Sequence, residues 1–283
     1  MSQSDSNHEE PVNLDGGGAD PSAETAKPDP FPKPEKMDRR SMLTVAASVA
    51  TAGWATVRYP RPPEFKGANS SVFIAKAPSY SVELAQKILT GVKTCGLDVR
   101  GKRILIKPNV VEFFENAAIN TDIAVVAAAL EVFQQLGAAS VVIGEGPGHR
   151  RDTLELAAQA RYRQEIPDFD HLFVDLNRDD VSPKAGFAGK NDRMYFANTV
   201  LGADLIVSVA KMKTHHWAGA TLSMKNLFGL LPGNVYGWPK NVLHHYGIPQ
   251  SICELNRMFP NTFAIIDGIV GMEGNGPIQG TPK

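Results

Sequence analysis

The sequence predicts an α/β protein with a mainly parallel, doubly wound sheet and flanking helices, preceded by a disordered leader. From residue 70 onward, apolar segments of strand length alternate with segments of helical spacing, and strands separated by helices of about 10–15 residues pair in parallel through crossover connections. Residues 205–210 (LIVSVA) form a continuous apolar run, which is typical of a strand buried on both faces. The first 36 residues show no apolar period.

The leader, residues 1–36, is acidic and rich in proline. It holds eight Asp or Glu residues against three lysines, together with six prolines. Such a segment cannot bury enough apolar surface to offset the entropy of ordering it. We therefore expect it to be disordered.

Residues 37–58 resemble a twin-arginine export signal. Arg39 and Arg40 precede an uncharged stretch, residues 41–57, and residues 50–52 (ATA) have the small side chains that a signal peptidase reads. The expected location is periplasmic or otherwise extracytoplasmic. An uncleaved membrane anchor is the alternative, although the stretch is shorter than the ~20 residues of a spanning helix. Residues 59–69 are expected to link this segment to an α/β domain at residues 70–283.

Composition limits the partners and cofactors. Of the 283 residues, 43% are hydrophobic and 21% are charged, and the net charge of -1 gives no case for a nucleic-acid partner. The two cysteines, Cys95 and Cys253, form no C-x-x-C pair. This chain alone therefore supplies no four-cysteine iron–sulfur cluster. We expect two separate thiols, with a disulfide after export as the alternative.

The expected elements of the domain follow from apolar spacing. The strands are residues 71–76, 103–107, 140–143, 171–176, 194–197, 205–210 and 262–266. The helices are residues 82–94, 122–136, 152–160 and 248–258, of which the second is capped by Thr121 and stopped by Gly137.

Polar side chains follow four of these strands. Ligands of such sheets bind outside the carboxyl ends of the strands, and lysines and amides suit a phosphate or carboxylate. A small anionic ligand is therefore expected, and Thr221 is expected to cap a helix whose first turn presents part of the site. The ligand-binding candidates are Lys107, Asn109, Lys211, Lys213, Thr214, Asn226, Asp267 and Glu273. A solvated basic surface loop is the alternative for residues 211–233.

The catalytic candidates at the same edge are His215, His216, Lys225 and Glu145. A histidine would act as general acid and base, and Glu145 or Asp267 would orient it or hold a metal ion. Adjacent side chains on a strand point apart, so a metal would take His215 with His244 or His245. The spacing of residues 144–148 is not that of a dinucleotide-binding loop.

Several motifs resemble a family known as the domain of unknown function 362. They are Lys107-Pro108-Asn109, Gly-Glu-Gly-Pro at 144–147, Lys-x-Lys-Thr-His at 211–215, Lys-Asn-Leu-Phe-Gly at 225–229, Asp267-Gly268, and Met-Glu-Gly-x-Gly-Pro at 272–277. The resemblance runs from about residue 72 to residue 283. It implies that members continue beyond the last residue here, and that many carry a separate iron–sulfur segment, whose cysteines this chain lacks.

A second resemblance concerns nickel-dependent lactate racemases. Gly219, Lys225, Pro232-Gly233 and then His244 or His245 follow a similar order. In those enzymes a lysine holds a nickel pincer cofactor, so the resemblance implies that role for Lys225 and a proton or hydride role for the histidines.

These observations leave two classes of function open. One is an enzyme that binds an anionic substrate or cofactor, with oxidoreductase or isomerase (racemase-like or epimerase-like) chemistry. The alternative is a non-catalytic protein that binds a ligand or docks on a redox partner protein, or an inactive truncated paralogue. Membrane contact is expected only through an uncleaved signal.

Overall fold

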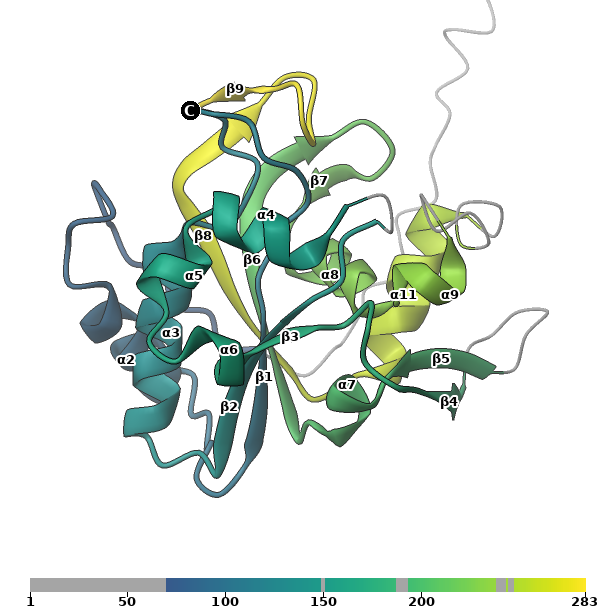
Figure 1. Ribbon diagram of the computed structural model, residues 1–283. Helices are drawn as coiled ribbons and strands as arrows, with labels where there is room; N and C mark the ends of the chain where they lie inside the picture. Colours follow the sequence, from purple (N-terminus) through teal and green to yellow (C-terminus); the bar gives the residue numbers. More distant parts are fainter. Residues whose placement is uncertain (1–69, 149–150, 187–192, 238–242, 244–246) are drawn as a thin grey trace, which may run out of the picture. The chain divides into compact units, whose positions relative to one another are not determined.

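The computed structural model describes residues 70–148, 151–186, 193–237, 243 and 247–283. The predicted leader, signal and linker, together with His244 and His245, lie outside the described residues. The described residues form an α/β fold around one mostly parallel sheet (Figure 1). Its strand order is β3-β2-β1-β6-β8-β9, and β7 pairs with β6.

The first five strands in that order run parallel, and the short β7 and β9 run antiparallel to their neighbours. A separate antiparallel pair is formed by β4 and β5. The strands are β1 Arg103–Lys107, β2 Ser140–Glu145, β3 Phe173–Asp175, β4 Val181–Ala185, β5 Arg193–Ala197, β6 Leu205–His215, β7 Gly219–Thr221, β8 Thr262–Glu273 and β9 Thr281–Pro282.

Helices cover both faces of the sheet, with α2 and α3 on one side and α8 and α11 on the other (Figure 1). The helical segments are α2 Leu84–Thr94, α3 Ile123–Gln135, α4 Thr153–Gln159, α5 Tyr162–Glu165, α6 Phe169–Leu172, α7 Asn198–Gly202, α8 Ser223–Asn226, η1 Leu227–Leu230, α9 Gly233–Tyr236 and α11 Ile248–Met258.

The strand β1 shows how the sheet separates two cores. Ile104 and Ile106 pack with α3 in one buried cluster, whereas Leu105 packs with η1 and α11 in another. Side chains of a strand alternate between the two faces of the sheet. The apolar run in β6 divides in the same way, with Val207 in the first cluster and Ile206 in the second. The predicted doubly wound architecture is therefore confirmed.

The predicted strand at residues 71–76 does not form, and this prediction was wrong. The side chains of Val72 and Ile74 are 77% and 89% exposed. The ring of Phe73 packs against Gly91 on α2 instead. A β-branched segment needs a neighbouring backbone to become a strand, and this one pairs with no strand of the sheet.

Two other predicted strands have different extents or partners, and one helix has a different cap. Of the strand predicted at 171–176, the first two residues belong to helix α6, and only residues 173–175 form a strand, β3. The strand predicted at 194–197 belongs to β5, which pairs with β4 outside the main sheet. Helix α3 is capped by Asp122 rather than Thr121, because the Asp122 carboxylate accepts a hydrogen bond from the Ala124 N–H at 2.9 Å.

The largest departure concerns β6 and β8, which continue well past their predicted ends. Lys211 pairs with β8, and residues 213–215 pair with β7, so β6 extends to His215. On β8 the register shifts, so that Lys211 lies opposite Asp267 while Lys213 lies opposite Met272. The polar residues predicted to follow these strands therefore lie on them.

Replacing Asp122 with alanine should lower the free energy of unfolding by about 1 kcal/mol, because the first turn of α3 would lose its side-chain cap. Chemical denaturation followed by circular dichroism measures this change. Gln135→Ala, at the exposed end of the same helix, is the control and should change little. Equal effects of the two substitutions would show that the cap contributes nothing specific.

Candidate anion-binding site

Four neighbouring parallel strands, in the order β2-β1-β6-β8, bring charged side chains to one edge of the sheet. Glu145 comes from β2, Lys107 from β1, Lys211 and Lys213 from β6, and Asp267 from β8. Each of the five is at most 2% exposed. Burial of this kind is rare for charged residues unless they are paired, so the partners of each group indicate its role.

Lys107 and Glu145 form a buried ion pair, with 2.6 Å between Lys107 Nζ and Glu145 Oε1. Lys107 Nζ also donates to the carbonyl oxygen of Pro108. Glu145 accepts from the backbone N–H of Gly146 through Oε1 and from that of Val110 through Oε2. Burial lowers the pKa of Lys107, and the carboxylate of Glu145 opposes this effect. Both oxygens of Glu145 are thus engaged within the protein.

Gly229 lies directly against this ion pair. A Cβ atom at position 229 would lie 2.5 Å from Lys107 Cε, 2.6 Å from Lys107 Nζ and 2.8 Å from Glu145 Oε1. These separations are far below van der Waals contact, so only glycine fits without moving the pair. This requirement accounts for the glycine that ends the Lys-Asn-Leu-Phe-Gly motif.

A second buried pair joins Lys211 to Asp267, with 2.9 Å between Lys211 Nζ and Asp267 Oδ2. Lys211 also donates to the hydroxyl oxygen of Tyr80, which donates to Asp267 Oδ1. Asp267 Oδ2 accepts from the backbone N–H of Asp122 as well. Burial and the adjacent carboxylate raise the pKa of Tyr80. This network holds residue 80, α3 and β8 together.

Lys213 lies between these pairs and has no carboxylate of its own. In the part of the chain that the structure describes, its Nζ donates only to the carbonyl oxygen of Ile119, at 2.6 Å. Burial lowers the pKa of Lys213 strongly; the positive charge of Lys225 adds to the effect, while Glu145 opposes it. Lys213 is therefore a buried amine that has no carboxylate partner among the described residues.

Lys225, on the short helix α8, is partly buried beside the same cluster. Its Nζ lies 5.0 Å from the centre of the Phe228 ring. Burial lowers the pKa of Lys225 to about 8, helped by the charge of Lys107 and opposed by Glu145. The predicted cap of α8 is absent, because Leu222 occupies the cap position without a side-chain hydrogen bond.

Amide and hydroxyl groups complete the floor of the site. Asn226 Nδ2 donates to the carbonyl oxygen of Lys107 and to Ser208 Oγ, and Asn226 Oδ1 accepts from Asn109 Nδ2. Asn109 Oδ1 and Thr221 Oγ1 are buried and have no hydrogen-bond partner among the described residues. Thr221 is the residue on β7 directly opposite Lys213. Buried polar atoms usually have a hydrogen-bond partner, so these two atoms are available to a bound group.

The two histidines of residues 215 and 216 have partners of their own. His215 Nδ1 accepts from the backbone N–H groups of Trp217 and Ala218, and the ring of His215 stacks on that of His216 at 5.1 Å. His216 Nδ1 lies 3.1 Å from the carbonyl oxygen of Gly276. The described residues contain no group of three His, Cys, Asp or Glu side chains that could hold a metal ion.

Two further ligand-binding candidates have local partners. Thr214 Oγ1 accepts from the backbone N–H of Gly276. Glu273 has an exposed side chain and lies 3.5 Å from Lys283. The structure thus gathers Lys107, Asn109, Glu145, Lys211, Lys213, Lys225, Asn226 and Asp267. The contacts described above for His215, His216, Thr214 and Glu273 are with residues outside this group.

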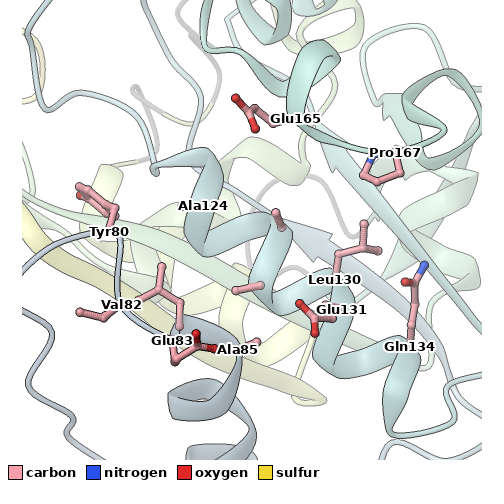
Figure 2. Close-up of a pocket in the computed structure, with 13 residues that line it drawn as sticks. Tyr80, Val82, Glu83, Ala85, Ala124, Leu130, Glu131, Gln134, Glu165 and Pro167 are labelled. Atoms are coloured by element: carbon pink, nitrogen blue, oxygen red, sulfur yellow. The ribbon is translucent and has the colours of Figure 1, made fainter.

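An open hollow of about 520 Å³ lies elsewhere, between α2 and α3 (Figure 2). Figure 2 shows Val82, Glu83 and Ala85 on one side of it and Leu130 and Glu131 on the other. Tyr80 also lines this hollow and is the one residue shared with the buried lysine cluster. Glu83, Glu131 and Glu165 line this hollow, and their carboxylates would repel an anion.

Tyr80 and Ser208 are residues that reasoning from the sequence missed. Tyr80 lies in a segment with no recognisable motif, and its partners Lys211 and Asp267 are far away in the chain. Ser208 was hidden in the apolar run of β6. A polar residue within an otherwise apolar buried strand was the available signal, because such a residue requires a partner.

The fold and site together define a class: an α/β protein with buried lysines at the carboxyl ends of its central strands. The model of the domain of unknown function (DUF362) matches residues 104–283, which is more than half of the chain. The chain therefore belongs to this family.

A curated relative is a thylakoid-associated protein of Synechocystis sp., which is 27% identical over 192 residues. The match covers 65% of this chain and 56% of the relative, so the chain spans little more than half of that protein's length. No solved structure matches the chain. Among the described residues, no helix has the length and apolar character needed to cross a membrane.

Glu145→Gln should lower the free energy of unfolding by about 3–5 kcal/mol, because the buried cation of Lys107 would lose its counter-charge. Urea denaturation measures the loss. The control is Asp170→Asn, which breaks the exposed pair of Asp170 with Arg163 and should have a much smaller effect. A similarly small effect of Glu145→Gln would mean that the buried pair is not needed for stability.

Gly229→Ala should destabilise the protein by about 1–3 kcal/mol, because the added methyl group would displace the Lys107–Glu145 pair. Thermal unfolding tests this, with Gly202→Ala as the matched control. A Cβ at position 202 would meet nothing closer than 3.9 Å. A melting temperature that is lowered no more than that of the control would contradict the tight fit at Gly229.

Proposed function

We propose that the chain binds a small carboxylate or phosphate at the carboxyl edge of its sheet, between Lys213 and Lys225. The observation that carries this proposal is an imbalance of charge. Among the described residues of the cluster, four lysines accompany two carboxylates, and each carboxylate is paired with a lysine other than these two. Lys213 and Lys225 are therefore the lysines of the cluster that have no carboxylate partner among the described residues.

The energetics of burial support an anion between them. A buried ammonium group without a counter-charge is costly, and the protein responds by lowering its pKa. The pKa values of both Lys213 and Lys225 are lowered, with burial as the largest cause. An anion at hydrogen-bond distance from both would favour their charged forms and regain this free energy.

The unpartnered polar atoms add to the case. Thr221 Oγ1 lies on the strand paired with Lys213, and its hydroxyl group is able to donate to an anion. Asn109 Oδ1 is an acceptor, so it would suit a hydroxyl group of the ligand or a bound water. Together these groups would suit an anion that also carries a hydroxyl or carbonyl group.

Enzymatic activity, redox-partner docking and export are more specific proposals, and each depends on a different observation. Isomerase or other enzymatic chemistry is favoured by the lowered pKa of Lys225, since such values are common at catalytic sites. Oxidoreductase chemistry and redox-partner docking have no supporting contact among the described residues. Export rests on residues 37–58, outside the described residues, and an extracytoplasmic location beside a membrane would agree with the thylakoid-associated relative.

The pH dependence of anion binding tests the proposal, with sulfate as the probe because its charge is constant above about pH 4. Lys225 is charged below its pKa of about 8 and neutral above it. Sulfate affinity should therefore fall as the pH rises through about 8, by up to about tenfold per pH unit. Isothermal titration calorimetry measures the affinity from about pH 6 to about pH 10.

Lys225→Arg keeps the charge throughout this range and should remove the step near pH 8, whereas Lys213→Met should weaken binding at every pH. Lys93→Met, on the exposed face of α2, is the control and should bind as the unchanged protein does. If sulfate binds with equal strength to the Lys213 and Lys93 variants, the site is not where we propose it.

A further inference from the structure

The amine of Lys225 differs from those of the three other lysines of the cluster. Lys107 and Lys211 each donate to a carboxylate, and Lys213 donates to a backbone carbonyl. For Lys225, the described residues provide no oxygen acceptor within hydrogen-bond distance. Its Nζ lies over the face of the Phe228 ring, 5.0 Å from the ring centre.

The surroundings of Lys225 also leave it reachable. Its side chain is only partly buried, whereas Lys107, Lys211 and Lys213 are at most 2% exposed. The charged groups that act on it come from three strands: Lys107 on β1, Glu145 on β2 and Lys213 on β6. Lys213 and Lys225 interact electrostatically, so a ligand bound by Lys213 would lie close enough to interact with the Lys225 amine.

We propose that Lys225 is a nucleophile that forms a reversible imine with the carbonyl carbon of a small oxo acid held at this site. The inference rests on the proposed anion site and deepens it, because it names the ligand class: an anion that carries a ketone or aldehyde group. Lys213 would hold the carboxylate or phosphate of the oxo acid, and Lys225 would attack its carbonyl carbon.

The reaction balances without any further reagent. The lone pair of neutral Lys225 Nζ forms a bond to the carbonyl carbon, and the carbonyl oxygen takes up the protons released by nitrogen. The resulting carbinolamine loses this oxygen as water, which leaves a carbon–nitrogen double bond. No electron is gained or lost overall, and added water reverses the sequence.

The protonation of Lys225 supports this chemistry. With a pKa of about 8, roughly a tenth of the amine is neutral at pH 7, against less than about a thousandth for an ordinary lysine. Burial and a neighbouring cation are the two means by which proteins activate a lysine nucleophile. The protonated amine of Lys225 would strengthen anion binding, and the deprotonated amine would attack the carbonyl carbon. Loss of one proton would therefore switch Lys225 from the first role to the second.

Nearby polar groups suit the oxygen that is lost. The hydroxyl group of Thr221 and the amide oxygen of Asn109 are buried and have no partner among the described residues. The Thr221 hydroxyl would donate to the carbinolamine oxygen, and the Asn109 oxygen would accept from the departing water.

The test uses the full chain with pyruvate as the probe, and borohydride to reduce any imine to a stable amine. Peptide mass mapping then shows which lysines carry the carboxyethyl group. We expect saturable modification of Lys225, at least about tenfold faster than that of exposed Lys93, with a rate that rises through about pH 8. Sulfate should slow it by competition. Because this peptide mapping uses the unaltered protein, its result does not depend on whether a variant folds.

Lys225→Arg should bind sulfate but lose the fast modification, with its fold checked by circular dichroism. If sulfate binds to the unaltered protein while pyruvate modifies Lys225 no faster than Lys93, the imine is excluded and the anion site stands. If sulfate does not bind and Lys225 is not modified, both proposals fail. Modification of Lys225 that neither saturates nor responds to sulfate also overturns the inference.

Discussion

A buried lysine–carboxylate pair joins the ends of β1 and β2, and the chain around it is arranged to complete its hydrogen bonds. The desolvation of two charges is costly, and their attraction offsets this cost only when the remaining donors and acceptors also find partners. Pro108 supplies an acceptor, and the N–H groups of Val110 and Gly146 supply donors. The two turns that leave these strands are therefore shaped by the pair, and η1 approaches it through a residue without a side chain.

This pair and the Lys211–Asp267 pair also determine where positive charge remains. Each carboxylate of the cluster forms an ion pair with one lysine. The Lys107–Glu145 pair joins β1 and β2, and the Lys211–Asp267 pair joins β6 and β8. Lys213 lies between them and Lys225 lies beside them, and neither has an acidic partner among the described residues. The protein thus pairs both carboxylates of this edge with its own lysines, and among the described residues the amines of Lys213 and Lys225 have no carboxylate partner.

The parallel sheet and the convergence of charged residues at its edge were predictable from the sequence, because both depend on local patterns. Strand and helix periods alternate, and polar residues follow apolar runs. The partners were not predictable: Glu145 could equally have faced a metal ion, and only the packed structure shows both its oxygens in use. The lengths of β6 and β8 were missed because residues 219–221 (GAT), which pair with β6, carry no strand pattern. Tyr80 was missed because nothing in its own segment indicates contact with β8. The roles of the histidines and the export signal stay predictions.

The register shift between β6 and β8 has a consequence for the spacing of like charges. On a regular strand, the side chains of Lys211 and Lys213 would project on the same face, about 7 Å apart, and repel each other. The two amines have separate partners, the Asp267 carboxylate and the Ile119 carbonyl oxygen, and β8 contains three more residues between Asp267 and Met272 than the facing segment of β6 does between Lys211 and Lys213. One residue more or fewer between positions 267 and 272 would therefore move Asp267, the carboxylate partner of Lys211, relative to Met272, while every residue of β6 stayed the same.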